Sequence, residues 1–163
     1  MSDSSQLIGT WTLKSFALHL TSDASSQPIF HPLGTSPIGR IMFKSDGYMS
    51  CTLTNPEAFE GWASPAWFLA SEQDIAGVAR PMTTYCGPYR VYEENGKSLL
   101  STDVEIALDP SWVGKPQVRQ WEVKQSGGKT LLVLRPVQEF LLPDGTPTKA
   151  IVVWEKWGEV AKL

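Results

Sequence analysis

The chain has 163 residues, of which 42% are hydrophobic, and this is enough for one folded domain with its own core. This ordinary apolar content, with only 19% charged residues, excludes a disordered chain, and the formal net charge of −3 offers no basic surface for nucleic acid or an anionic membrane. Seven tryptophans are many for this length and predict an aromatic-rich interior or pocket. We expect a single domain over residues 1–163.

The first residues contain neither a basic region nor an apolar run, so no secretion signal is predicted there. No stretch approaches the roughly 20 apolar residues that a membrane span needs. Cys51 and Cys86 are the only cysteines, and each lies in a strand-like segment. These features predict a cytoplasmic protein with two reduced core thiols, a disulfide being the minor alternative.

Residues 8–20 alternate large with small or polar side chains, which predicts a long β-strand. Gly9 lets another backbone come close, and Trp11 adds a bulky group near the start of the strand. Such a strand is typical of a closed antiparallel barrel, because the first strand must pair with both the second and the last. We therefore expect Trp11 to pack at a closed base near the last strand.

A hairpin is predicted around residues 45–47, Ser-Asp-Gly, which fit a three-residue loop with glycine in the left-handed position. Counting outward pairs Phe43 with Met49 and Ile41 with Cys51. One face of the hairpin is then wholly apolar, and we expect it to face the interior.

Residues 55–83 break the strand pattern and predict a helical insertion between the third and fourth strands. Asn55 followed by Pro56 is a helix start, and Ser71 with Asp74 is a variant of the capping box. Between these starts lie four aromatic residues: Phe59, Trp62, Trp67 and Phe68. Such an insertion either closes the barrel mouth, with its tryptophans and Phe68 on the ligand, or forms a satellite core without a ligand role.

Further strands are predicted over residues 84–93, 97–108, 117–125, 129–134 and 149–157. Asn95-Gly96 and Gly127-Gly128 are signals for tight turns, whereas residues 109–116 are predicted to form a loop. The total is eight strands with mostly short connections. The predicted fold is an all-β, eight-stranded antiparallel up-and-down barrel with room for one small ligand.

Gly9-Thr10-Trp11 resembles the Gly-x-Trp signature of the lipocalins. Four further segments resemble a family of microbial and fungal lipocalin-like domain proteins: Asp46-Gly47-Tyr48-Met49-Ser50, Tyr85-Cys86-Gly87-Pro88-Tyr89, Pro110-Ser111-Trp112-Val113-Gly114 with Gln117-Val118-Arg119, and Val153-Trp154-Glu155-Lys156. The segments span nearly the whole chain in one order, so the set is more specific than any single motif. Two positions depart from the family pattern: Lys156 stands where arginine is frequent, and Asp103 lies near a frequent histidine.

This resemblance implies a lipocalin-like barrel that binds a small hydrophobic molecule. Some small fungal proteins with barrels of this general kind act in natural-product pathways as cofactor-free cyclases or isomerases, which is an analogy at the level of the fold. His19 and His31 are the only histidines, and the chain has no Cys-x-x-Cys, phosphate-loop, dinucleotide or Gly-x-Ser-x-Gly motif. We therefore expect no metal and no cofactor.

Arg119 is the polar residue that strand register assigns to the interior. The two-residue Gly127-Gly128 turn places Trp121 opposite Leu134, so the face shared by Arg119 and Trp121 is the apolar, inward one.

The preceding strand carries Asp103 and Glu105 on one face. If the loop between the two strands folds symmetrically, Glu105 lies opposite Arg119, close enough for a direct contact. Inside the barrel such a pair would be partly buried, where an unpaired charge is costly. The alternative is a solvated pair on the outer wall, with Val104 and Ile106 inside.

The predicted function is a cofactor-free cyclase or isomerase acting on a hydrophobic, oxygenated small molecule in natural-product biosynthesis. Arg119 would stabilise charge on a carbonyl or enol, Glu105 would orient it or act as acid–base group, and Asp103 or a tyrosine hydroxyl would be a second donor or acceptor. The predicted ligand contacts are Met49, Trp62, Trp67, Phe68, Tyr85, Tyr89 and Trp121.

Two other functions stay open. A non-catalytic carrier needs only the cavity and one or two anchors, whereas an interaction module would have a filled barrel. We expect a monomer or homodimer whose partner is a small hydrophobic molecule, without nucleic acid or membrane.

Overall fold

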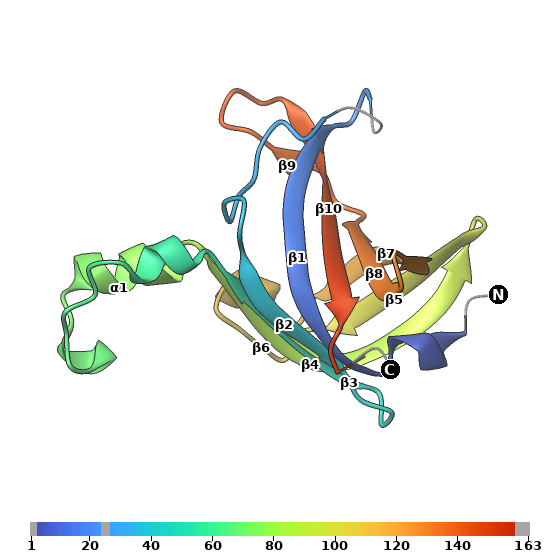
Figure 1. Cartoon of the computed structure of the whole chain (residues 1–163), viewed down its shortest axis with the longest axis horizontal. Coiled ribbons are helices and arrows are strands. Elements are labelled where there is room, and N and C mark those ends of the chain that lie inside the picture. Colours follow the sequence, from blue (N-terminus) through green and yellow to red (C-terminus); the bar gives the residue numbers. More distant parts are fainter. Residues whose placement is uncertain (1–2, 24–26, 159–163) are drawn as a thin grey trace.

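Eight antiparallel strands close into a barrel in the computed structural model, which describes residues 3–23 and 27–158 (Figure 1). The strands are β1 (Gly9–Leu20), β2 (Ile38–Phe43), β3 (Tyr48–Thr54), β4 (Met82–Glu94), β5 (Lys97–Asp103), β7 (Pro116–Ser126), β8 (Lys129–Pro136) and β10 (Pro147–Lys156). Neighbours in the chain pair with each other, and β1 also pairs with β10. Two short strands, β6 (Ile106–Ala107) and β9 (Phe140–Leu141), pair with β4 and β10. The predicted eight-stranded up-and-down barrel is confirmed.

The connections divide the barrel into two unlike ends. Tight turns join β2 to β3, β4 to β5 and β7 to β8, and together they form what we call the turn end. The longer connections lie at the opposite end, the loop end, because alternate connections of an up-and-down barrel lie at opposite ends. The Asn95-Gly96 turn has φ values of 51° and 71°, the left-handed conformation that a two-residue hairpin turn requires.

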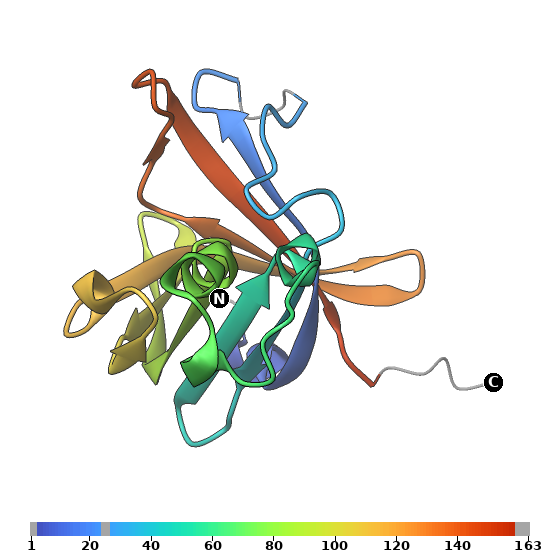
Figure 2. The same cartoon turned by 90° about the vertical axis from the view of Figure 1, so that its left-hand side faces the viewer.

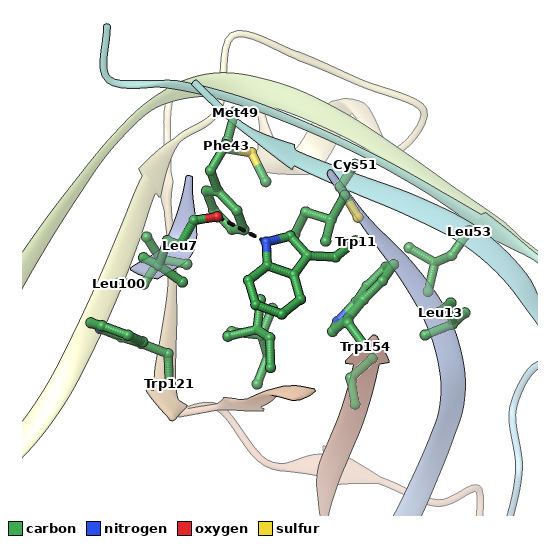
Figure 3. Close-up of a cluster of buried hydrophobic side chains, with 14 of the residues drawn as sticks. Leu7, Trp11, Leu13, Phe43, Met49, Cys51, Leu53, Leu100, Trp121 and Trp154 are labelled. Carbon is green, nitrogen blue, oxygen red and sulfur yellow. Dashed lines mark hydrogen bonds between the residues drawn. The ribbon is translucent and has the colours of Figure 1, made fainter. Parts of the chain in front are cut away.

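The turn end is closed by Trp11 and the 3₁₀ helix η1 (Ser4–Leu7). Trp11 is fully buried, and its indole N–H donates to the carbonyl oxygen of Leu7 over 2.8 Å (Figure 3). The Lys156 ammonium, from the residue that pairs with Trp11 on β10, lies 4.3 Å from the centre of the indole ring. The expected packing of Trp11 at a closed base beside the last strand is confirmed.

The register of the β2–β3 hairpin is the predicted one, since Phe43 pairs with Met49 and Ile41 pairs with Cys51. All four side chains are buried. Their apolar face points inward because side chains alternate between the two faces of a strand.

The insertion between β3 and β4 contains the 3₁₀ helices η2 (Pro56–Phe59) and η3 (Trp67–Leu69) and the helix α1 (Glu72–Ala79). Both predicted starts are confirmed: the Asn55 side chain accepts from the Glu57 N–H, and the Ser71 hydroxyl accepts from the Asp74 N–H. The insertion projects to one side of the barrel in Figure 1 and lies in front of the strands in Figure 2.

The predicted continuous strand over residues 97–108 is wrong in its second half. Between the pairs Tyr89–Thr102 and Cys86–Ile106, three steps along β4 are matched by four steps along the partner (89−86 = 3; 106−102 = 4). One extra residue of this kind is a β-bulge, which exchanges the inward and outward faces. Val104 is therefore buried, whereas Ile106 is exposed.

The cause of this bulge lies on β4, at Gly87-Pro88. Pro88 has no N–H for the ladder, and a Cβ on Gly87 would lie 2.0 Å from the Asp103 carbonyl oxygen. Only glycine at position 87 lets the backbone of residues 103–105 lie so close to β4. Beyond this close approach, the Glu105 N–H donates to the Cys86 carbonyl over 2.9 Å, and β6 begins at the next residue.

Candidate functional site

A cavity of about 260 Å³ lies inside the barrel toward the loop end. Its strand-borne walls are mostly apolar: Phe16, Ile41, Leu53, Leu134, Val152 and Trp154. The loop-end connections and β9 add Pro32, Leu33, Trp112 and Phe140. The cavity therefore begins where the closed core of the turn end stops, and it is bordered by the loop-end connections and by β9.

The polar groups of the cavity are few, and the two that carry charge are both cationic. Arg119 enters from β7 and Arg80 from the end of the insertion, joined by Tyr85, Cys51 and Thr83 from the β3–β4 wall. Among the described residues no aspartate or glutamate lines the cavity.

Arg119 is half-buried, and it contacts only neutral oxygen atoms in the described part of the chain. Its guanidinium donates to the Val118 carbonyl over 3.1 Å and to the Gln117 side-chain oxygen over 3.4 and 3.5 Å. Within residues 3–23 and 27–158 it forms no ion pair with a carboxylate. A guanidinium with five N–H donors thus has donor capacity left over inside the barrel.

Tyr85 stands beside Arg119 and is 7% exposed. Its ring packs edge-on against Trp112, with 5.4 Å between ring centres. Burial raises the pKa of Tyr85 to about 12, although the positive charge of Arg119 partly lowers it. Burial likewise raises the pKa of Cys51 to about 12, and the positive charge of Arg119 again opposes the shift. Both groups are therefore neutral at pH 7, and the tyrosine hydroxyl is available as a donor.

Trp154 also lines the cavity and carries an indole N–H donor. The side chain is 2% exposed, and its indole N–H has no hydrogen-bond partner among the described residues. A buried donor without a partner costs about 1–3 kcal/mol, and an acceptor on a bound molecule would recover part of this.

The predicted contact of Glu105 with Arg119 is wrong. The residue opposite Arg119 on β5 is Leu100, and Glu105 lies beyond the end of β5, where it is exposed. There its carboxylate accepts from the Tyr48 hydroxyl over 2.8 Å, and contacts with Cys86 and Glu105 raise the pKa of Tyr48 above its usual value.

Asp103 is also exposed and pairs with Arg90 over 3.4 Å on the outer wall. Of the three residues predicted to act in catalysis, the structure places Arg119 at the cavity and the two carboxylates outside it.

Of the predicted ligand contacts, Tyr85 lines the cavity, whereas Met49, Tyr89 and Trp121 do not. Met49 and Trp121 are buried in the core of the turn end (Figure 3). The Tyr89 hydroxyl donates to the Lys44 carbonyl over 3.0 Å, beside the β2–β3 turn. An inward orientation was predicted for Trp121. An inward orientation alone does not show whether a side chain lies in the filled core at the turn end or at the cavity.

Trp62, Trp67 and Phe68 belong to the insertion and do not line the cavity either. Trp67 and Phe68 pack edge-on against each other and are 71% and 67% exposed. The insertion reaches the cavity at its C-terminal end, through Arg80 and Pro81.

Trp112 lines the cavity, although the sequence predicted only a loop there and no contact of this residue with the ligand. It ends the 3₁₀ helix η4 (Pro110–Trp112), in which the Asp109 side chain accepts from the Ser111 N–H over 2.9 Å. The signal is the same as at Asn55-Pro56, a capping side chain followed by proline at the first position. It predicts the helix, but the place of the indole against Tyr85 depends on the tertiary structure.

Residues 8–157 match the family described as Lipocalin-like domain, so the match spans all eight strands of the barrel. The chain belongs to the lipocalin-like domain family. Comparisons with curated proteins and with solved structures found no match. A lipocalin-like barrel fits the binding of a small hydrophobic molecule.

The described part of the chain lacks two features. In it no group of three or more His, Cys, Asp or Glu side chains is placed to hold a metal ion. None of the helices described there has the length and apolar character to cross a membrane.

Proposed function

We propose that this lipocalin-like barrel binds a small, mostly apolar, oxygenated molecule in the cavity at its loop end. The observation that carries the proposal is an internal space of about 260 Å³ with apolar walls and a few hydrogen-bond donors. Small-molecule pockets have volumes of roughly 300–1,000 Å³, apolar linings and few polar groups. This volume is slightly below that range, so the ligand is small or leaves one part outside.

A hollow of about 290 Å³ with a more polar lining than the cavity adjoins it and provides a place for such a part. Arg80, Thr83 and Trp112 line both spaces, whereas Asp109 lines the hollow but not the cavity. A ligand with a polar substituent would thus bury its apolar body inside the barrel and extend the substituent past Trp112.

Catalysis of a cyclisation or isomerisation is the second candidate, and the neighbouring Arg119 and Tyr85 favour it. A guanidinium and a neutral hydroxyl in a mostly apolar cavity stabilise negative charge as it develops on a carbonyl or enol oxygen. Asp103 and Glu105 lie on the outer wall, so an enzyme of this kind would depend on Arg119 and Tyr85. Binding alone needs no such group, and it is the function that the geometry supports best.

The experiment is to fill the cavity and measure binding of octan-1-ol and 2-naphthylmethanol by calorimetry. Val152 lines the cavity, whereas the next residue, Val153, points to the other face of β10. We expect Val152→Phe to weaken binding at least tenfold and Val153→Phe to leave it within twofold. Absence of binding to the parent protein, or equal effects of the two variants, would contradict the proposed function.

A further inference from the structure

We propose that the ligand is an organic acid, and that its carboxylate lies against Arg119 and Tyr85. This inference rests on the proposed function and adds the chemical class of the molecule that the cavity takes.

The first argument is the charge of the cavity wall. The chain as a whole has a net charge of −3, yet the charged residues lining the cavity, as far as the structure describes it, are Arg80 and Arg119. Two cationic groups and no acid make the cavity unfavourable for a cation. They make it favourable for an anion, because the low dielectric of an apolar cavity strengthens the attraction.

The second argument is the state of the Arg119 guanidinium. Its contacts with the Gln117 side chain, at 3.4 and 3.5 Å, are longer than the usual 2.7–3.2 Å of an N–H···O hydrogen bond. Its remaining contacts are with the neutral Val118 backbone carbonyl and the neutral Tyr85 hydroxyl. A half-buried guanidinium is best matched by a carboxylate, which accepts two parallel hydrogen bonds from its planar fork.

The third argument is that the carboxylates of the segment before β7 are held elsewhere. The Tyr48 hydroxyl holds Glu105 on the outer wall, and Arg90 holds Asp103 there. Asp109 caps η4 and faces the polar hollow, beside Arg80. The described chain therefore supplies no internal counter-ion to Arg119, and a ligand carboxylate would take that part.

The neighbouring groups fit an acceptor as well. Tyr85 and Trp154 both line the cavity and carry an O–H or N–H donor, and the buried Trp154 donor has no partner in the described chain. Three donors from three strands would thus face one oxygen-rich group. Arg80 is exposed at the mouth, where a positive charge increases the association rate of an anion.

The test compares two pairs of compounds with the same apolar body: octanoate with octan-1-ol, and naphthalene-2-carboxylate with 2-naphthylmethanol. Affinities are measured by calorimetry for the parent protein, Arg119→Met and Arg90→Met. Arg90 is the control because its guanidinium pairs with Asp103 on the outer wall. Hydrogen bonds to charged groups contribute about 1.5–3 kcal/mol, so we expect the acids to bind roughly 10- to 100-fold more tightly than the alcohols.

We expect Arg119→Met to weaken binding of the acids by that factor and to leave the alcohols within twofold, and Arg90→Met to change neither. Equal binding of acid and alcohol by the parent protein would overturn the inference and leave the proposed function standing. So would an equal loss of both in Arg119→Met while that variant stays folded. If neither member of either pair binds the parent protein, the proposed function fails and the inference with it. The comparison within the parent protein needs no variant, so it decides the question even if Arg119→Met does not fold.

Discussion

Replacement of Gly87 by alanine is expected to be among the most damaging single changes in the barrel. The added Cβ would lie 2.0 Å from the Asp103 carbonyl oxygen, 2.9 Å from its carbonyl carbon and 3.3 Å from the Glu105 nitrogen. Carbon and oxygen atoms in contact are normally about 3.3–3.6 Å apart, so the two strands must separate by more than about 1 Å. All three obstacles are backbone atoms, which cannot turn aside as a flexible side chain can.

Overpacking of a core costs about 1–3 kcal/mol and occasionally more, and a clash with backbone belongs at the upper end. We therefore expect Gly87→Ala to lower the free energy of unfolding by about 3 kcal/mol, or roughly 6–12 °C in Tm for a chain of this length. The displacement would also reach the cavity, because Val104 exchanges hydrogen bonds with Lys115 and Gly114 in the loop that carries Trp112. Weaker binding of octanoate should accompany the loss of stability.

The measurement is urea unfolding followed by circular dichroism. Gly77→Ala in α1 is the matched control, since a Cβ at that position meets nothing within 4 Å. Alanine is favoured over glycine in a helix by about 0.5–1 kcal/mol, so the control should not lose stability. A Gly87→Ala protein within about 0.5 kcal/mol of the parent would refute the steric origin of the bulge.

Two further predictions concern buried groups of the cavity. Tyrosine in the unfolded chain titrates near pH 10, but burial raises the pKa of Tyr85 to about 12, so the stability present below pH 10 should decrease by up to about 2–3 kcal/mol as the pH rises to 12. Tyr85→Phe removes this contribution, and urea unfolding at pH 9, 10 and 11 should show a shallower decrease; parallel curves would contradict the assignment. Cys51 is buried with its pKa raised to about 12, whereas Cys86 is half-buried, so iodoacetamide at pH 8 should modify Cys86 at least tenfold faster. Peptide mass spectrometry measures the two rates, and comparable rates would show that the cavity wall opens readily.

The strands of the barrel were predictable because their signals are local. Alternation with a period of two, an Asn-Gly turn and a glycine loop depend on residues close together in the chain. The same counting gave the pairing of Trp121 with Leu134, which the structure confirms. It also gave an inward position for Arg119, and this residue lines the cavity.

The error at Glu105 arose where that counting assumed one regular strand. Pro88 and Gly87 lie about fifteen residues earlier, and only their contact with the later strand produces the extra residue. An alternating pattern cannot reveal a bulge whose cause lies on the neighbouring strand. Asp103 is outside the cavity for a different reason: it ends β5 three positions after the residue that pairs with Arg119, and therefore lies on the opposite face of that strand.

The sequence by itself thus determined the class of fold, the order of the strands, the closed base at Trp11 and the family to which the chain belongs, because each depends on local periodicity, turn chemistry or motif order. Only the tertiary structure decided which end of the barrel is hollow, which aromatic residues line it and which partner Arg119 lacks. Those properties depend on how far side chains from distant strands fill a shared interior. The register of a strand shows which way a side chain points, but the packing of every other strand decides what it meets there.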